Sequence, residues 1–151
     1  MKISQLMTKT VRTCLSSDTL EQAARLMWDH DVGVVPVVDE TGQVVGMVTD
    51  RDACMAALTQ ARPLHALTVA VAMSKHVVTC RPEDTAEEIS KLMSKNKIRR
   101  IPVVDDAQRP IGIVSLSDLA IAMSKGKGRD VPAAEVAGTL AAICGAPVAT
   151  A

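Results

Sequence analysis

The sequence has almost no aromatic residues, and its positive and negative charges cancel. Trp28 is the only aromatic side chain, because phenylalanine and tyrosine are both absent. Proteins that bind single-stranded nucleic acid stack the bases on aromatic side chains, so this scarcity counts against such a site. The 17 basic residues equal the 17 acidic residues, which removes any overall field that would attract nucleic acid or an anionic membrane. Any anion-binding site must therefore be local.

Long hydrophobic runs are lacking as well. The apolar run at residues 32–38 is interrupted by Gly33 and Pro36 and is too short to span a bilayer. The first ten residues, MKISQLMTKT, lack the apolar stretch of a secretory signal. We therefore expect a cytoplasmic protein with no membrane partner.

Motifs for metal binding and catalysis are absent. The cysteines Cys14, Cys54, Cys80 and Cys144 form no C-x-x-C pair and have no histidine at zinc-site spacing. We expect reduced, mostly buried thiols rather than a disulfide or a metal site. There is no nucleophile motif, Walker loop or H-E-x-x-H segment. The sequence therefore predicts a protein that is not an enzyme, with no catalytic or metal-binding residues and no required cofactor.

A gapless internal repeat dominates what is present. A shift of 66 residues places Met7 on Met73 and Cys14 on Cys80. The same shift aligns the two PVVD segments at residues 36–39 and 102–105, and then GMVTDRD at residue 46 with GIVSLSD at residue 112. Two copies of one unit follow from this register, at residues 1–66 and 67–125. Residues 126–151 are assigned to a linker and a short C-terminal helix.

Each copy predicts the element order β-α-β-β-α. In the first helix of each copy, Asp18 and Asp84 are the expected N-caps, with Glu21 and Glu87 completing capping boxes. The second helix of each copy begins one residue after a hydroxyl side chain that can cap it. The expected strands lie at residues 11–14, 34–38, 44–49, 77–80, 101–104 and 111–115.

A further helix is predicted after the second copy. The segment SKGKGRD has the composition of a loop, and Pro132 suits the first turn of a helix. Val136, Leu140 and Ile143 share one face of that helix. Because such a short helix is marginal alone, we expect it to dock on a second protomer or across the edge of the module.

The segments VVPVVD and RIPVVD, followed by GMVTDRD and GIVSLSD, resemble a tandem pair of CBS domains. This family of regulatory domains occurs in many nucleotide-sensing proteins, and the resemblance covers about residues 1–125. The segments TDRD, RRIPVVD and LAAICGAPVATA are further similar to the stand-alone bacterial CBS-pair proteins that include the hypoxic-response type. The resemblance implies an α/β fold of the α+β type, with the two repeats packed as a pseudo-twofold pair around clefts for adenosine-containing ligands. It also implies a homodimer, for which we expect an apolar interface made by helices of both repeats.

Two carboxylates suit the ribose of such a ligand. Ionised Asp52 and Asp118 can each accept hydrogen bonds from vicinal hydroxyls. Thr49 and Ser115 lie at the preceding strand ends, where a hydroxyl can start the helix and also reach the sugar. The N–H groups at each helix start favour a phosphate. The same four residues also suit a purely structural role as caps, and this alternative stays open.

Basic residues and an apolar slot complete the predicted site. In nucleotide-binding members of the family, basic residues reach across the pair to the ligand held by the other copy's aspartate. Carried over, Arg99 or Arg100 serves the Asp52 cleft and Arg51 serves the Asp118 cleft, whereas a solvated surface pair is the alternative for the two neighbouring arginines. Adenine requires an apolar slot with backbone hydrogen bonds. The remaining candidate ligand-binding residues are Val35, Pro36, Ile101, Pro102, Thr13 and Thr79.

These features predict a regulatory module that binds AMP, ADP, ATP, NAD or S-adenosylmethionine. The expected partners are that small molecule, a second copy of the chain and a client protein that the sequence does not identify. One alternative is a dimerisation or protein-interaction module with empty clefts. A second alternative is a redox-stress protein, for which a disulfide between Cys14 and Cys80 would be the sign.

Overall fold

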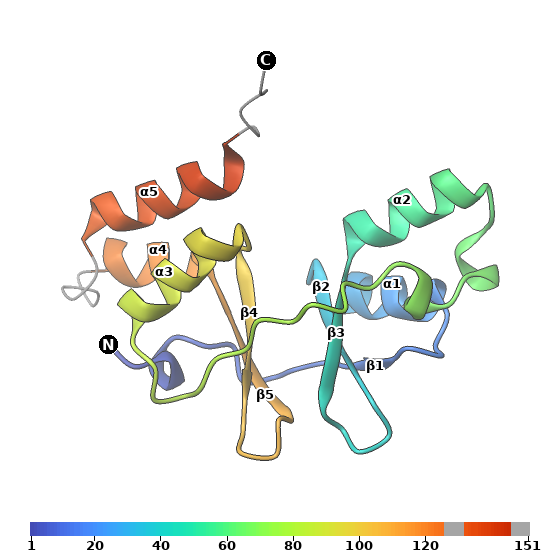
Figure 1. Ribbon diagram of the computed structural model, residues 1–151, viewed down its shortest axis with the longest axis horizontal. Coiled ribbons are helices and arrows are strands. Elements are labelled where there is room, and N and C mark those ends of the chain that lie inside the picture. The colour runs from blue at the N-terminus through green and yellow to red at the C-terminus, as the bar shows by residue number, and fades with distance from the viewer. Residues whose placement is uncertain (126–131, 146–151) are drawn as a thin grey trace. The chain divides into compact units, whose positions relative to one another are not determined.

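The computed structural model describes residues 1–125 and 132–145, and Figure 1 labels their helices and strands. The predicted linker at residues 126–131 lies outside the described residues. Short 3-10 helices occur at η1 (Ile3–Gln5), η2 (Leu64–Ala66) and η3 (Val69–Val71). The other elements are β1 (Cys14–Leu15), α1 (Leu20–Asp29), β2 (Val34–Val38), β3 (Val44–Thr49), α2 (Asp50–Gln60), α3 (Ala86–Asn96), β4 (Arg100–Val104), β5 (Pro110–Ser115), α4 (Leu116–Ser124) and α5 (Ala133–Cys144).

The chain forms two compact units whose boundaries differ from those of the sequence repeats. The first-repeat unit comprises Thr10–Val78 and Val104–Ile111. The second-repeat unit comprises Met1–Lys9, Thr79–Val103 and the described residues from Gly112 onward. Each unit contains one α/β layer with its own buried core, so the predicted α+β fold class is confirmed.

The first-repeat unit is built on a three-stranded sheet in the order β1-β2-β3. Strand β2 pairs parallel with β1 and antiparallel with β3. All five residues of β2 are buried, and the four valines among them have the β-branched side chains that favour a strand. From α1, Leu20 and Ala23 pack against this strand with no exposed surface. Each large aliphatic side chain buried here contributes about 1.5–3 kcal/mol.

The second-repeat unit contains the β4–β5 hairpin with α3 and α4. Both central strands match the predicted runs to within one residue. The strand predicted at residues 77–80 is reduced to one parallel bridge between Cys80 and Val103. The corresponding strand of the first repeat is Cys14–Leu15 rather than residues 11–14. Only the end of each predicted first strand therefore reaches its neighbour.

The N-caps of the first helices differ from the prediction by one residue. Thr19 caps α1 in a capping box with Gln22, and Thr85 caps α3 in the same way with Glu88. The carboxylate of Asp18 instead accepts the N–H of Leu15, at 2.8 Å. The carboxylate of Asp84 likewise accepts the N–H of Arg81, at 2.7 Å. The predicted caps Asp18 and Asp84 are thus turn residues, because a threonine directly after each is closer to the free amides of the helix.

The segment before each repeat packs against the strand of the other repeat. Residues 1–9 lie beside β5, where Thr8 and Ile113 form an antiparallel bridge (Figure 1). The equivalent segment after α2 pairs with β3 through a bridge between Met47 and Ser74. The beginning of the first repeat is therefore part of the second-repeat unit.

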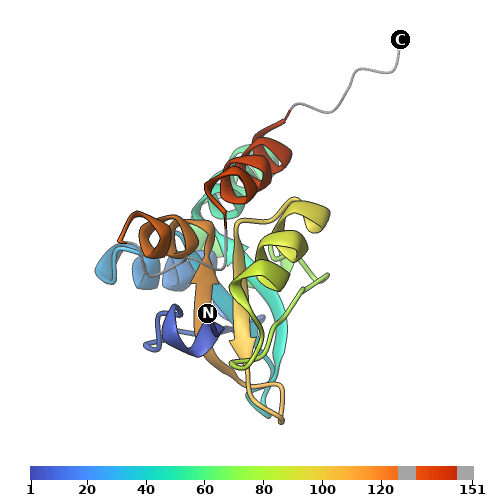
Figure 2. The ribbon, with the colours of Figure 1, turned by 90° about the vertical axis from the view of Figure 1, so that its left-hand side faces the viewer.

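Helix α5 packs on α3 and α4 of its own chain (Figure 2). The hydroxyls of Ser90 on α3 and Thr139 on α5 are both buried and lie 2.9 Å apart. Pro132 is the N-cap residue, directly before the first turn. Within its own unit α5 buries Thr139, whereas Leu140 on its apolar face is 52% exposed, so the expected docking of this face on a second protomer or across the module edge stays a prediction. In the described parts of the chain, no helix is both long and apolar enough to cross a membrane.

Candidate functional site

The hydroxyl and the carboxylate at the start of α2 form a reciprocal cap. Thr49 Oγ1 accepts the N–H of Asp52 at 3.1 Å, and Asp52 Oδ2 accepts the N–H of Thr49 at 2.9 Å. The start of α4 repeats this arrangement with Ser115 and Asp118, at 3.2 Å and 2.8 Å. There the serine hydroxyl also donates to Asp118 Oδ2, at 2.6 Å. Both predicted hydroxyl–carboxylate pairs therefore serve as helix caps.

The caps use only one oxygen of each carboxylate. Within the described residues, Oδ1 of Asp52 and Oδ1 of Asp118 have no hydrogen-bond partner. Both side chains are half-buried, and the hydrogen bond to Oδ2 fixes the orientation of each carboxylate. A carboxylate held in this way is preorganised to accept a hydrogen bond from a ligand hydroxyl.

The two helix starts differ in how their amides are occupied. In α2, the N–H of Asp50 donates to the carbonyl of Gly33 at 3.4 Å, and the N–H of Arg51 donates to Asp50 Oδ1 at 2.7 Å. In α4, the N–H of Leu116 donates to the carbonyl of Arg99 at 2.9 Å. In the part of the chain that the structure describes, the N–H of Ser117 has no acceptor. The expected phosphate donors at the start of α2 are therefore already occupied, and α4 keeps one.

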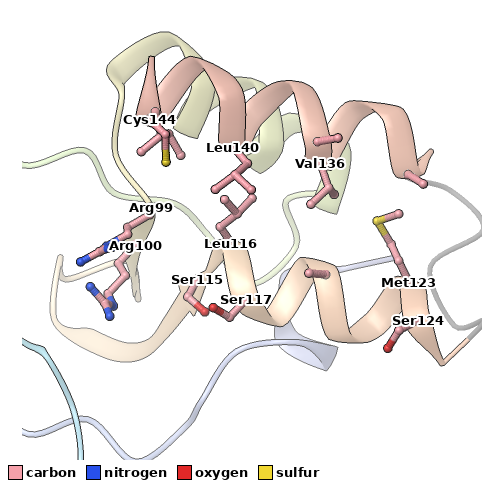
Figure 3. Close-up of a pocket in the computed structure, with 14 residues that line it drawn as sticks. Arg99, Arg100, Ser115, Leu116, Ser117, Met123, Ser124, Val136, Leu140 and Cys144 are labelled. Carbon is pink, nitrogen blue, oxygen red and sulfur yellow. The ribbon is translucent and has the colours of Figure 1, made fainter. Parts of the chain in front are cut away.

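The structure places three of the predicted residues around a single cavity. Arg99, Arg100 and Ser115 line a space of about 720 Å³ between α4 and α5 (Figure 3). Asp118 lies elsewhere, in a hollow of about 400 Å³ beside the N-terminal segment. Arg51 is exposed in the first turn of α2. The pairing of Arg99 or Arg100 with Asp52, and of Arg51 with Asp118, joins residues of different units and stays a prediction.

The remaining predicted residues differ in exposure. Val35 and Ile101 have no exposed surface and belong to the cores of their units, and Pro36 and Pro102 beside them are also buried. Thr13 is exposed, and its equivalent Thr79 is half-buried. Their assignment to an adenine and ribose site stays a prediction. The aliphatic residues of α4 and α5 that complete the large cavity were absent from the predicted site, although the shared face of Val136, Leu140 and Ile143 could have indicated them.

Two of the four thiols are buried and two are exposed. Burial raises the pKa of Cys14 and of Cys80 to about 12, and the nearby carboxylates of Asp18 and Asp84 add to the shift. Cys54 and Cys144 are exposed, contrary to the expectation of mostly buried thiols. All four cysteines are free. Across residues 1–125 and 132–145, no group of three or more His, Cys, Asp or Glu side chains is placed to hold a metal ion.

Comparison with known proteins identifies the family. The model of the CBS domain matches residues 3–58 and 69–125. The CBS domain-containing protein YhcV of Bacillus subtilis is 39% identical over 119 residues, which is 79% of this chain and 83% of YhcV.

Solved structures agree with this assignment. The CBS domain pair of protein MJ0100, in complex with 5′-methylthioadenosine and S-adenosyl-L-methionine, is 29% identical with a TM-score of 0.73, over 82% of this chain and 99% of that one. Hypoxic Response Protein I with two coordinated zinc ions is 26% identical with a TM-score of 0.72, over 80% of this chain and 98% of that one. The repeats, the helix caps and these matches together establish that the chain belongs to the CBS domain family and carries two CBS domains in tandem.

Proposed function

We propose that this chain is a regulatory module, without catalytic activity of its own, that binds an adenosine-containing ligand through Asp52 and Asp118. The observation that carries the proposal is the same half-used carboxylate at the start of α2 and of α4. Each is held by its cap and keeps Oδ1 available for a ribose hydroxyl. The related CBS pair of MJ0100 is bound to methylthioadenosine and S-adenosylmethionine, which supports this ligand class.

The acidic and basic residues contact different parts of the proposed ligand. In this proposal the aspartates bind the ribose, and Thr49 and Ser115 hold the aspartates in place. Arg99 and Arg100 add a cationic group for any phosphate. The Asp118 cleft would have only Arg51 for the phosphate, whereas the Asp52 cleft would have Arg99 and Arg100. We therefore expect the Asp52 cleft to be the stronger site for a phosphorylated adenosine. AMP, ADP, ATP and NAD then differ from adenosine mainly through contacts with arginine.

Calorimetry on matched variants tests the proposal. Asn at position 52 can still accept the N–H of Thr49, so Asp52→Asn should keep the cap and lose the charge-assisted bond to ribose. We expect AMP to bind about 10- to 100-fold more weakly to this variant, because a hydrogen bond to a charged group contributes about 1.5–3 kcal/mol. Asp118→Asn should weaken the second, weaker site. Glu21→Gln, which changes an acidic residue in the first turn of α1, is the control.

A comparison of ligands separates sugar from phosphate. Arg100→Ala should weaken AMP much more than adenosine, since only AMP carries the phosphate. The proposal fails if the parent chain binds none of AMP, ATP, NAD, methylthioadenosine and S-adenosylmethionine. It also fails if both Asp→Asn variants bind the best of these ligands as tightly as the parent.

An interaction module is the second candidate, favoured by one exposed helical face. Trp28 on α1 is 86% exposed. It borders a hollow of about 500 Å³ between α1 and α2, whose wall includes Met27 and Ala53. In the second repeat, α5 covers the equivalent face of α3 and α4. We therefore propose that a homodimer forms through the α1–α2 faces of two copies rather than through helices of both repeats.

A further inference from the structure

The cavity between α4 and α5 has apolar walls along most of its length. Helix α5 contributes Val136, Leu140 and Ile143, and α4 contributes Leu116 and Met123. Its volume of about 720 Å³ falls within the range of about 300–1,000 Å³ that is usual for small-molecule sites. All of these residues belong to the second-repeat unit, so the cavity is complete within that unit. Such walls suit an aliphatic ligand.

One end of the cavity is cationic. Figure 3 shows Arg99 and Arg100 together at that end and Met123 at the opposite end, with Leu116 and Leu140 between them. Among the described residues that line the cavity, none is acidic. The guanidinium of Arg99 makes no hydrogen bond or ion pair with any described residue. The guanidinium of Arg99, with no carboxylate beside it in the wall, favours an anionic group at this end.

The cationic end of the cavity lacks an acidic residue that the first repeat has at the equivalent position. Leu116 occupies the position of Asp50, whose carboxylate accepts the N–H of Arg51 in the first repeat. A leucine cannot accept that bond, so in the described structure the N–H of Ser117 is left without an acceptor. Ser117 also lines the cavity. The helix start therefore offers an open donor beside the two arginines, in addition to its dipole.

We propose that the α4–α5 cavity binds a small amphiphilic anion, an aliphatic chain that ends in a carboxylate or a phosphate. The anionic group lies at Arg99, Arg100 and the N–H of Ser117, and the aliphatic chain lies between α4 and α5. This site shares Arg99, Arg100 and Ser115 with the proposed adenosine sites, but neither Asp52 nor Asp118 lines it. Both proposals use the arginines, so variants of other residues must distinguish them.

Calorimetry with alkyl carboxylates of increasing length tests the chemistry. Hexanoate, octanoate and decanoate, each kept below its critical micelle concentration, are titrated into the full chain. Each added methylene should tighten binding by up to about fourfold until the cavity is filled. Decanol, which has the same chain without the charge, should bind at least tenfold more weakly than decanoate. Decyl phosphate should bind at least as tightly as decanoate.

Two variants localise the site. Ala120 lines the cavity from α4 and is exposed, so Ala120→Phe should fill the cavity with little effect on the core. This variant should lose decanoate binding and bind AMP like the parent. Asp52→Asn should weaken AMP binding and bind decanoate like the parent. The Arg99→Gln, Arg100→Gln double variant should weaken decanoate about 10- to 100-fold and leave decanol unchanged. Arg62→Gln, an exposed arginine in the other unit, is the control.

Three results would overturn the proposal. The first is no binding of monomeric decanoate or decyl phosphate by the parent chain. The second is unchanged decanoate binding in Ala120→Phe after circular dichroism has shown that the variant is folded. The third is sedimentation with vesicles of anionic phospholipid while monomeric ligands do not bind, because that result assigns the arginines to a lipid surface. Loss of decanoate binding with retention of AMP binding would leave the adenosine proposal intact.

Discussion

The sulfur of Met73 occupies the space beside Gly46 that a side chain would need. A Cβ atom at Gly46 would lie 2.9 Å from Met73 Sδ and 3.0 Å from the carbonyl oxygen of Ser74. The equivalent pair in the second-repeat unit is Gly112 with Met7. The glycine at the head of each GMVTDRD-type segment is therefore required by the methionine of the segment that packs on it.

Gly46→Ala should consequently destabilise the protein by about 1–3 kcal/mol, because overpacking displaces both Met73 and a backbone carbonyl. Urea unfolding measures the change. Gly138→Ala on α5 is the control, since a Cβ there has no neighbour within 4 Å. That substitution should stabilise the protein by about 0.5–1 kcal/mol, the usual difference between alanine and glycine within a helix. Equal effects of the two substitutions would contradict the explanation.

The buried hydroxyl pair should determine how firmly α5 is held. Thr139→Val keeps the shape of the side chain but removes the partner of Ser90, at an expected cost of about 1–2 kcal/mol. The double variant Ser90→Ala, Thr139→Val should be more stable than the sum of the single effects predicts. Hydrogen exchange of the α5 amides and urea unfolding are the measurements. Strict additivity would show that the two hydroxyls do not interact.

The buried thiols should make stability fall at alkaline pH. Burial raises the pKa of Cys14 from the ordinary thiol value of 9.0 to about 12 in the folded protein, and it raises the pKa of Cys80 equally. The unfolded thiols ionise first as the pH rises, so the stability they contribute is full below pH 9 and is lost between about pH 9 and 12. At pH 10 the ionisation of each thiol should lower the free energy of unfolding by about 1 kcal/mol.

Urea unfolding at pH 7 and pH 10 should therefore show a smaller loss in Cys14→Ala than in the parent. Alkylation provides a second readout. Iodoacetamide at pH 8 should modify Cys54 and Cys144 quickly and the buried pair only on unfolding. A stable intramolecular disulfide in protein purified with reductant would instead support the redox-stress alternative.

Trp28 provides a direct signal for the proposed dimer, because it is the only tryptophan. Its fluorescence should shift to longer wavelength as the protein is diluted and the α1–α2 faces separate. Trp28→Ser should give a monomer in light scattering at tens of micromolar, since aromatic side chains dominate interface energies. Leu140→Ser, which changes an exposed apolar residue on α5, should remain dimeric. A monomeric parent at that concentration would refute the dimer.

The repeat and its strongest local signals could be predicted from the sequence. Strands β2 and β3 span the predicted residues, because their β-branched runs are bounded by clear turn residues. The caps Thr49 and Ser115 were also predicted, since each hydroxyl directly precedes a helical pattern. The N-cap of the first helix in each repeat could not be predicted to the residue. Asp18 and Thr19 are both good N-caps, and only the geometry of the turn decides between them.

Contacts between distant segments could not be predicted. The aligned Met7 and Met73 look alike in sequence, and nothing local shows that each packs on the strand of the other repeat. The face of α5 was visible in its spacing, but the surface that it covers depends on Ser90, whose first-repeat counterpart is Ala24. Only part of the candidate site could be predicted from the sequence. Its polar residues belong to the repeated motifs, whereas the aliphatic residues of its walls have the same sequence pattern as ordinary core residues.

The exchange of the leading segments imposes an order on folding during synthesis. Met73 can pack against Gly46 soon after both have left the ribosome, because the two residues are near each other in sequence. Met7 and Thr8 are made long before Gly112 and Ile113, and they must wait until those two residues have emerged. Such distant pairings form slowly, since the intervening chain must be ordered before they contribute. Residues 1–9 therefore reach their final positions only after most of the second repeat has been made.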